Sequence, residues 1–173
     1  MTKLLSNFPN GTAAAMIKLA LKEVGYVEGA NNLNKFAPIA GHANNRPWCN
    51  SFVSAMFIQA GIREAIPITA SCAATLAWGI KNKRIIQTEK AKWGDLLIFD
   101  FTKSGQSEHI GLAVKNYNPI TKTIQTIEGN TGEKSQSNGE GVYVKIRSKD
   151  FIKAVIRPLY ETPGATQGEK VKQ

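Results

Sequence analysis

The hydrophobic pattern of the chain changes from a helical period to a strand period at about residue 95. In the first half, residues 13–24 carry apolar side chains three and four positions apart, and Gly25 ends the pattern. In the second half, short apolar or alternating runs are separated by turn residues, of which Asn118-Pro119 is the clearest pair. Helices followed by an antiparallel meander are typical of an α+β domain with its helices on one face of the sheet.

The same pattern divides the chain into a folded domain and a short tail. We expect one domain over residues 1–160, because 173 residues are enough for a single core of ordinary size. Residues 161–173 are polar and rich in small side chains, and we expect a disordered tail there. Within the domain the sequence predicts helices over 13–24, 49–60 and 71–81, a polar loop over 26–47, and about five or six strands, including 96–101, 109–116, 123–128, 141–147 and 154–159.

Cys49 is the residue that indicates chemistry most directly. Pro47 suits the first turn of a helix, and the apolar residues that follow recur at helical spacing up to Gly61. Cys49 therefore lies at the N-terminal end of a buried helix, where free N–H groups and the positive end of the helix dipole face its sulfur. Such surroundings lower the pKa of a thiol and favour the nucleophilic thiolate.

His109 begins a predicted strand and is the partner that a cysteine nucleophile needs. Alternation places His109, Gly111 and Ala113 on one face of that strand. Two small residues below the imidazole would let a helix come close and bring its cysteine to the histidine. A lone histidine at a strand start is by default a surface residue. Two observations argue against that interpretation here: the chain has only one other histidine, His42, and the next strand carries suitable partners.

Glu128 and Asn130 end the next predicted strand and should point to one side, beside the strand of His109. A carboxylate or amide there can accept from the imidazole Nδ1–H, which fixes the tautomer and stabilises the imidazolium. A spare amide N–H₂ can instead help to hold an oxyanion. The alternative is an ordinary turn, since Glu-Gly-Asn-Thr-Gly is good turn sequence. The chain order Cys, His, Glu, Asn favours a cysteine hydrolase.

Trp48 and Cys72 are two further residues whose places the sequence predicts. Trp48 precedes the nucleophile, and we expect it to line the cleft and contact the substrate. Cys72 lies on an apolar helix face and is assigned to the core. With only two cysteines in the chain, neither a disulfide scaffold nor a zinc site is indicated.

The ordered set of motifs resembles the CHAP family, the cysteine, histidine-dependent amidohydrolases and peptidases related to NlpC-type and papain-like enzymes. The resemblance spans roughly residues 14–157 and is closest to the phage endolysins of that family. Its stretches are Gly25-Tyr26-Val27-Glu28-Gly29 with Asn31-Asn32, Pro47-Trp48-Cys49 with Phe52-Val53-Ser54, Trp93-Gly94-Asp95-Leu96-Leu97-Ile98-Phe99, Glu108-His109-Ile110-Gly111-Leu112 and Ile127-Glu128-Gly129-Asn130.

The resemblance implies a papain-like α+β fold and hydrolysis of an amide bond in peptidoglycan. By that likeness Cys49 is the nucleophile, His109 the base and acid, and Glu128 the residue that orients the imidazole. Asn130 is a second orienting residue or an oxyanion donor.

One departure from the family concerns metal. Many members carry acidic calcium ligands in the loop before the cysteine, whereas residues 30–48 here contain no Asp or Glu. Calcium sites normally include carboxylates. We therefore expect no metal site and no cofactor.

The formal net charge of +9 indicates attraction to an anionic partner, with simple solubility as the alternative. Peptidoglycan with its anionic wall polymers fits that charge, whereas no stretch matches a nucleic-acid-binding motif. We expect a monomer without stable membrane insertion. The first residues lack the apolar stretch of a signal peptide, so we expect synthesis in the cytoplasm and action on the wall after release.

Three functions stay open at this point. The first is a phage endolysin, acting as an endopeptidase or as an N-acetylmuramoyl-L-alanine amidase. The second is a secreted antibacterial amidase toxin, which would have a cognate inhibitor protein. The third is a catalytically idle module that binds the cell wall through its charge.

Overall fold

The computed structural model describes residues 12–160, so the prediction of a disordered tail over 161–173 lies outside the described residues. The helices are α1 (Ala13–Lys22), α2 (Phe36–Ile39), α3 (Cys49–Gln59) and α4 (Cys72–Lys81). The strands are β1 (Ile85–Ile86), β2 (Leu96–Phe99), β3 (His109–Ala113), β4 (Thr123–Thr131), β5 (Gly141–Ser148) and β6 (Ile152–Ile156).

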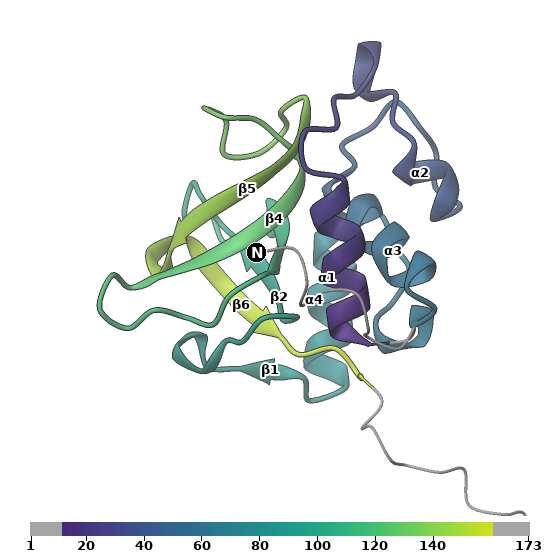
Figure 1. Ribbon diagram of the computed structural model, residues 1–173. Coiled ribbons are helices and arrows are strands. Elements are labelled where there is room, and N and C mark those ends of the chain that lie inside the picture. Colours follow the sequence, from purple (N-terminus) through teal and green to yellow (C-terminus); the bar gives the residue numbers. More distant parts are fainter. Residues whose placement is uncertain (1–11, 161–173) are drawn as a thin grey trace, which may run out of the picture.

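The six strands form one antiparallel sheet in the order β1-β6-β2-β3-β4-β5. Strands β2 to β5 follow one another as a meander, and β6 returns to pair with β2 on the other side. The four helices gather on one side of this sheet (Figure 1). The α+β class and the strand number predicted from the hydrophobic pattern are therefore confirmed.

Two of the three long helices begin with a side-chain cap. The hydroxyl of Thr12 accepts from the N–H of Ala15 at the start of α1, and the hydroxyl of Ser71 accepts from the N–H of Ala74 at the start of α4. At α3 the capping position holds Trp48, which within the described chain makes no side-chain cap bond. The first N–H groups of α3 are thus left to other acceptors, which matters because Cys49 opens this helix.

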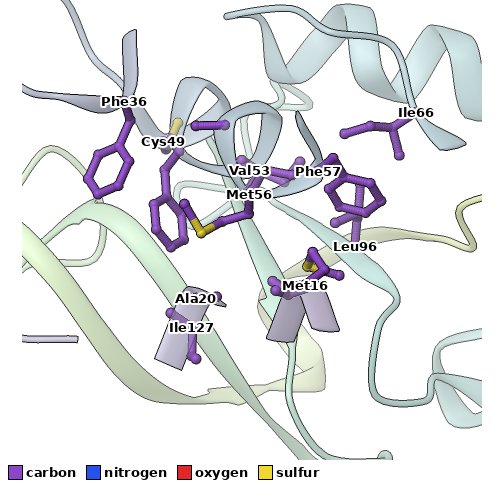
Figure 2. Packing of buried hydrophobic residues seen from close by; sticks show 14 of the residues in the cluster. Met16, Ala20, Phe36, Cys49, Val53, Met56, Phe57, Ile66, Leu96 and Ile127 are labelled. Atoms are coloured by element: carbon purple, nitrogen blue, oxygen red, sulfur yellow. The ribbon is translucent and has the colours of Figure 1, made fainter. Parts of the chain in front are cut away.

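Helix α3 is the central element of the core. Every residue from Cys49 to Phe57 is buried, because α3 is covered by α1 and α2 and lies on β3 and β4. Figure 2 shows Val53, Met56 and Phe57 of this helix meeting residues from α1 and from the sheet.

The sheet buries apolar residues on both of its faces. Ile110 and Leu112 of β3 belong to the cluster that includes the helices. Ala113 belongs to a second cluster on the opposite face, with Leu97 and Phe99 of β2. The side chains of β3 therefore alternate between the two faces as predicted, and each face contributes to a different hydrophobic cluster.

The polar loop predicted over residues 26–47 contains more structure than the sequence indicates. A short helix, α2, forms there because the side chain of Asn34 accepts from the N–H groups of Phe36 and Ala37. The two-residue strand β1 is also new. Among residues 12–160, each helix is too short or too polar to span a membrane.

Candidate active site

Cys49 occupies the first position of α3, as the sequence predicts. The backbone N–H of Asn50 is directed at its sulfur, and the residue keeps a small exposed fraction of 6 %. His109 and Glu128 are fully buried. Access to this group in the structure is therefore from the side of Cys49.

The start of α3 comes close to the sheet at Gly129 of β4. A Cβ atom added to Gly129 would lie 2.6 Å from Cβ of Phe52 and 2.6 Å from Cζ3 of Trp48, which is closer than real Cβ atoms approach. The missing side chain thus allows the helix to sit directly on β4. The alternative of an ordinary turn at Glu128-Gly129-Asn130 is wrong, because residues 128–130 belong to β4.

The role predicted for Gly111 also needs correction. His109 and Gly111 lie on the face of β3 opposite the helical cluster, so the small residues there make no room for a helix. A Cβ atom at Gly111 would instead lie 2.9 Å from Cγ of Glu128 and 3.2 Å from the ring of Phe99. Gly111 therefore provides the space in which the carboxylate of Glu128 reaches His109.

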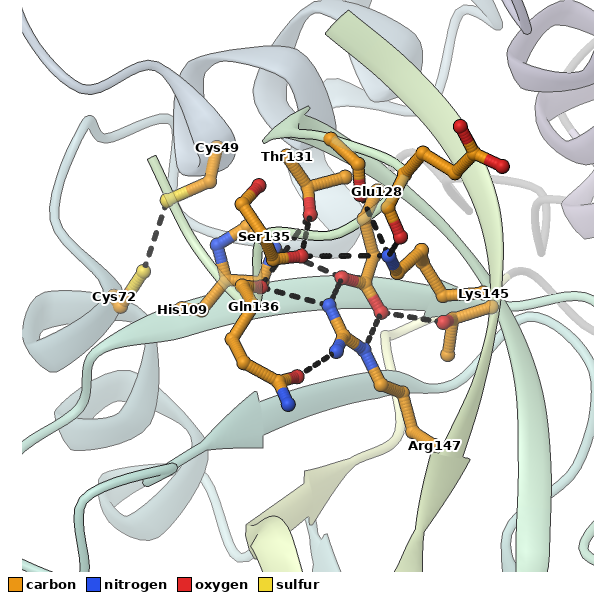
Figure 3. A network of polar contacts seen from close by, with 12 residues as sticks. Cys49, Cys72, His109, Glu128, Thr131, Ser135, Gln136, Lys145 and Arg147 are labelled. Atoms are coloured by element: carbon orange, nitrogen blue, oxygen red, sulfur yellow. Dashed lines mark hydrogen bonds and ion pairs between the residues drawn. The ribbon is translucent and has the colours of Figure 1, made fainter. Parts of the chain in front are cut away.

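His109 contacts Glu128 through the ring nitrogen opposite to the predicted one. The distance from Nε2 to Oε2 of Glu128 is 3.0 Å, whereas Nδ1 is buried and has no hydrogen-bond partner among residues 12–160. The side chain of Glu128, on β4, lies beside Gly111, two residues after His109 on β3. The imidazole reaches it through Nε2, the ring nitrogen further from the backbone of His109. Figure 3 shows His109 between Cys49 on one side and Glu128 on the other. The arrangement leaves Nδ1 for proton exchange at the reacting centre.

Arg147 of β5 joins these residues, although the sequence did not predict it there. Its guanidinium is buried and donates from Nε to Oε1 of Glu128, at 2.8 Å, and from a terminal nitrogen to Oε2. It also lies over the rings of Phe99 and Phe101. No sequence signal separates Arg147 from Lys145 on the same strand face, because the buried position follows only from the pairing of β4 with β5.

The charges of the site follow from these contacts. Burial opposes ionisation of Glu128, but Arg147 and His109 outweigh it and hold its pKa at about 2. Burial would also lower the pKa of His109, yet Cys49 and Glu128 outweigh it and raise that pKa to about 9. At neutral pH the carboxylate is therefore ionised and the imidazole protonated.

The pKa of Cys49 is lowered well below its ordinary value. A hydrogen bond with the Cys72 thiol is the main cause, burial opposes it, and His109 and the Asn50 N–H add to it. The site thus favours a thiolate next to an imidazolium, which is the reactive form of a cysteine nucleophile.

Asn130 lies at a β-bulge. The register of β4 and β5 shifts between Glu128 and Thr131, and Asn130 adopts a left-handed φ of 56°. Its Oδ1 is buried and without a hydrogen-bond partner in the described chain, so it does not accept from His109. Glu128 is therefore the residue that orients the imidazole.

Trp48 does not line a cleft. It is fully buried, its ring is stacked on Phe36 at 5.3 Å between centroids, and its Nε1–H donates to Glu28. The aromatic side chains of Tyr26 and Phe52 complete this cluster. The prediction of a substrate contact fails because the position before the helix points into the core and away from solvent.

Cys72 is buried as predicted, but its place is more specific than a core position. It opens α4, and its sulfur lies 3.6 Å from that of Cys49. Residues 12–160 contain no group of three or more His, Cys, Asp or Glu side chains that would hold a metal ion.

Comparison with protein-family models and with curated protein sequences finds no match to this chain. Among solved structures, the chain is similar to the P60 domain of antigen MAP1204 from M. avium subspecies paratuberculosis. The TM-score is 0.51 at 18 % sequence identity, with 87 % of this chain and 96 % of that domain covered. Together with the helices and the sheet described above, this likeness confirms the papain-like α+β fold that the sequence predicts.

Proposed function

We propose that the protein is a cysteine hydrolase that cleaves an amide bond in peptidoglycan. The observation that carries the proposal is the series of contacts from the Cys49 thiol through His109 to the buried carboxylate of Glu128. The resemblance of the surrounding motifs to CHAP enzymes supports the substrate class. The fold likeness to a P60 domain agrees with it.

In the first half of the reaction, the Cys49 thiolate attacks the carbonyl carbon of the amide. The oxyanion that forms is held by backbone N–H groups at the start of α3, which have no side-chain cap in the described chain. The amide of Asn130 is a second donor that we place there. His109 then gives its Nδ1 proton to the leaving amine, and a thioester remains on Cys49.

In the second half, water attacks the thioester and His109 takes up a proton from it. The carboxylate product leaves, and the thiolate is regenerated. Glu128 keeps the imidazole oriented through both steps and stabilises its protonated form. Arg147 acts through Glu128 by keeping that carboxylate ionised and in place.

In biological terms we propose a phage endolysin that is made in the cytoplasm and reaches the wall after release. The same chemistry would serve a secreted antibacterial amidase toxin. A tight protein inhibitor encoded with the enzyme would favour the toxin.

The test is digestion of purified cell walls followed by mass spectrometry of the released fragments. New amino and carboxyl ends at one defined amide would identify the bond, whether it lies between muramic acid and L-alanine or within the peptides. We expect Cys49→Ala to release nothing while keeping its circular dichroism spectrum. Gln59→Ala, an exposed change at the far end of the same helix, is the matched control and should digest walls normally.

The idle binding module is separated from the enzyme by thiol reactivity. An iodoacetamide reaction at Cys49 that is fast at neutral pH indicates an activated thiolate. Slow alkylation together with retained wall binding would favour the idle module.

A further inference from the structure

The two cysteines of the chain meet in the site. Cys49 and Cys72 are the first residues of α3 and α4, both are free thiols, and their sulfur atoms lie 3.6 Å apart. Their exposed fractions are 6 % and 7 %. The catalytic steps proposed above use only the first of these thiols.

Polar contacts hold the two helix starts together around the sulfur pair. The side chains of Asn50 and Ser54, on α3, both donate to the backbone carbonyl of Thr69, just before α4. Thr75 of α4 donates in return to Oδ1 of Asn50, at 3.1 Å. Buried polar groups fixed on both sides make the approach of the two thiols a built feature of the fold, beyond the filling of a core position.

We propose that Cys49 and Cys72 form a reversible disulfide that blocks the nucleophile. A disulfide needs sulfur atoms about 2.05 Å apart, so the two atoms must approach by roughly 1.6 Å. Side-chain rotation at two helix starts allows such a movement without unfolding either helix. No third cysteine can compete for either thiol, since the chain has only these two.

The oxidant we assign is a low-molecular-weight disulfide. The Cys49 thiolate attacks one of its sulfur atoms, a mixed disulfide forms on Cys49, and the first small thiolate leaves. Cys72 then gives its proton to the small thiolate released in the first step and attacks the Cys49 sulfur of the mixed disulfide, and the second small thiolate leaves. In total, two protein thiols are oxidised, one small disulfide is reduced to two small thiols, and the hydrolase has no free nucleophile.

The chemistry of the site favours these roles for the two thiols. Cys49 is the attacking thiol because Cys72, His109 and the Asn50 N–H favour its thiolate. In the reduced protein, the hydrogen bond to Cys49 raises the pKa of Cys72 and keeps it a thiol. Once Cys49 is capped and neutral, that negative neighbour is gone, and Cys72 is released to act as the resolving thiol.

The test uses the full chain and oxidised glutathione as the probe, and reads out mass and free thiols. We expect the wild type to lose two hydrogens without gaining a glutathione group, and to show no thiol available for alkylation after denaturation. Dithiothreitol should restore both thiols. A persistent glutathione adduct, two remaining thiols or a disulfide-linked dimer would each overturn the proposal.

Two variants separate the internal disulfide from simple capping of the nucleophile. Cys72→Ser keeps the size of the side chain, and Cys72→Ala covers the case in which the hydroxyl disturbs folding. In both we expect the reaction to stop at a glutathione adduct on Cys49, so full protection of Cys49 in either folded variant would contradict the assigned order of steps.

The inference rests on the proposed function only in its effect on activity. Wall digestion by the oxidised wild type should fall to the level of Cys49→Ala and return with dithiothreitol. If the internal disulfide forms but the reduced protein digests no walls either, the proposed hydrolase is refuted and the sulfur chemistry still holds. Wall digestion that persists after the disulfide has formed would refute the switch.

Discussion

At the residue scale, the site depends on a carboxylate that is buried between two cations. Glu128 has no exposed surface and contacts both Arg147 and His109. Its pKa is lowered from 4.5 to about 2, so its contribution to stability is present above pH 4.5 and is lost as the pH falls toward 2. A buried ion pair of this kind contributes little net stability against apolar residues, but it fixes geometry, and here the geometry belongs to the imidazole.

The first prediction concerns the supporting role of Arg147. Arg147→Met leaves the Glu128 carboxylate without its main cation, so its pKa should rise and its hold on protonated His109 should weaken. We expect activity to fall and its acidic limb to move to higher pH. Breaking a buried pair also costs about 3–5 kcal/mol of unfolding free energy. Activity against a soluble peptide across pH, with urea unfolding beside it, measures both effects.

Arg157→Met is the matched control for Arg147. Arg157 makes a similar two-bonded contact with a buried carboxylate, Asp95, at 2.9 Å, but Asp95 is remote from Cys49. We expect lower stability with an unchanged acidic limb. A pH profile that moves equally in both variants would show that Arg147 acts only on stability.

The second prediction is a difference between the pH dependence of alkylation and of hydrolysis. Alkylation needs only the Cys49 thiolate, so its rate should rise at a pH well below the ordinary thiol pKa of 9.0 and then stay high. Hydrolysis also needs protonated His109, so it should fall above about pH 9. The measurement is the iodoacetamide rate beside kcat/KM for one peptide. A common alkaline decline in both would contradict the assigned imidazolium.

At the scale of elements, the site exists because α3 touches β4. The contact is made at Gly129, where a side chain would overlap Phe52 and Trp48. The distance between the cysteine and the sheet is therefore set by one residue without a side chain.

The third prediction tests this contact. Gly129→Ala should push α3 away from β4, and overpacking of this kind costs about 1–3 kcal/mol. Activity should fall by more than the loss of folded protein explains, because Cys49 moves with the helix. Gly29→Ala is the control, since its new methyl group would meet only the half-exposed Leu33, with the side chain at 3.3 Å and the backbone oxygen at 3.5 Å. Equal activity of the two variants per folded molecule would contradict the role of Gly129.

The elements were more predictable from the sequence than their contacts. The spacing of apolar residues predicts three helices and five strands, because each of these elements is buried on one face or on both faces. The strand β1 has two residues, too few to show a period. The bulge at Asn130 and the buried place of Arg147 depend on pairing between strands that are distant in the chain, which a local pattern does not contain.

The candidate site was predictable in its residue types and less so in its geometry. Cys49, His109 and Glu128 come together as the motif order indicates. The prediction that Glu128 contacts Nδ1 was wrong, since the sequence does not show how far along β3 the carboxylate lies. Trp48 was predicted to line the cleft because the partners that bury it, Phe36 and Glu28, come from a loop whose fold the sequence left open.

At the scale of the whole molecule, the protein carries a net charge of +9, which favours attraction to anionic polymers. Four lysines are exposed between the end of α4 and the start of β2, namely Lys81, Lys83, Lys90 and Lys92. Such charge attracts an anionic polymer over a distance that salt shortens, from about 10 Å at 0.1 M to about 3 Å at 1 M.

The fourth prediction separates this attraction from catalysis. Salt at several hundred millimolar should weaken sedimentation of the protein with purified walls, while cleavage of a small uncharged peptide should change little. Both are measured on the same protein over one salt series. Equal loss in the two assays would mean that salt acts on the site itself and that the surface charge has no concentrating role.

The positions of the site residues along the chain also determine how the site is assembled. Glu128 and Arg147 are 19 residues apart on neighbouring strands, whereas Cys49 and His109 are separated by 60 residues, from 49 to 109. Closing the longer segment costs about 1 kcal/mol more in chain entropy. The ion pair therefore belongs to a local hairpin, and the nucleophile joins it only when the helical layer has docked. A partial opening that lifts the helices from the sheet would separate Cys49 from His109 and stop the reaction, while the pair of Glu128 and Arg147 stays formed.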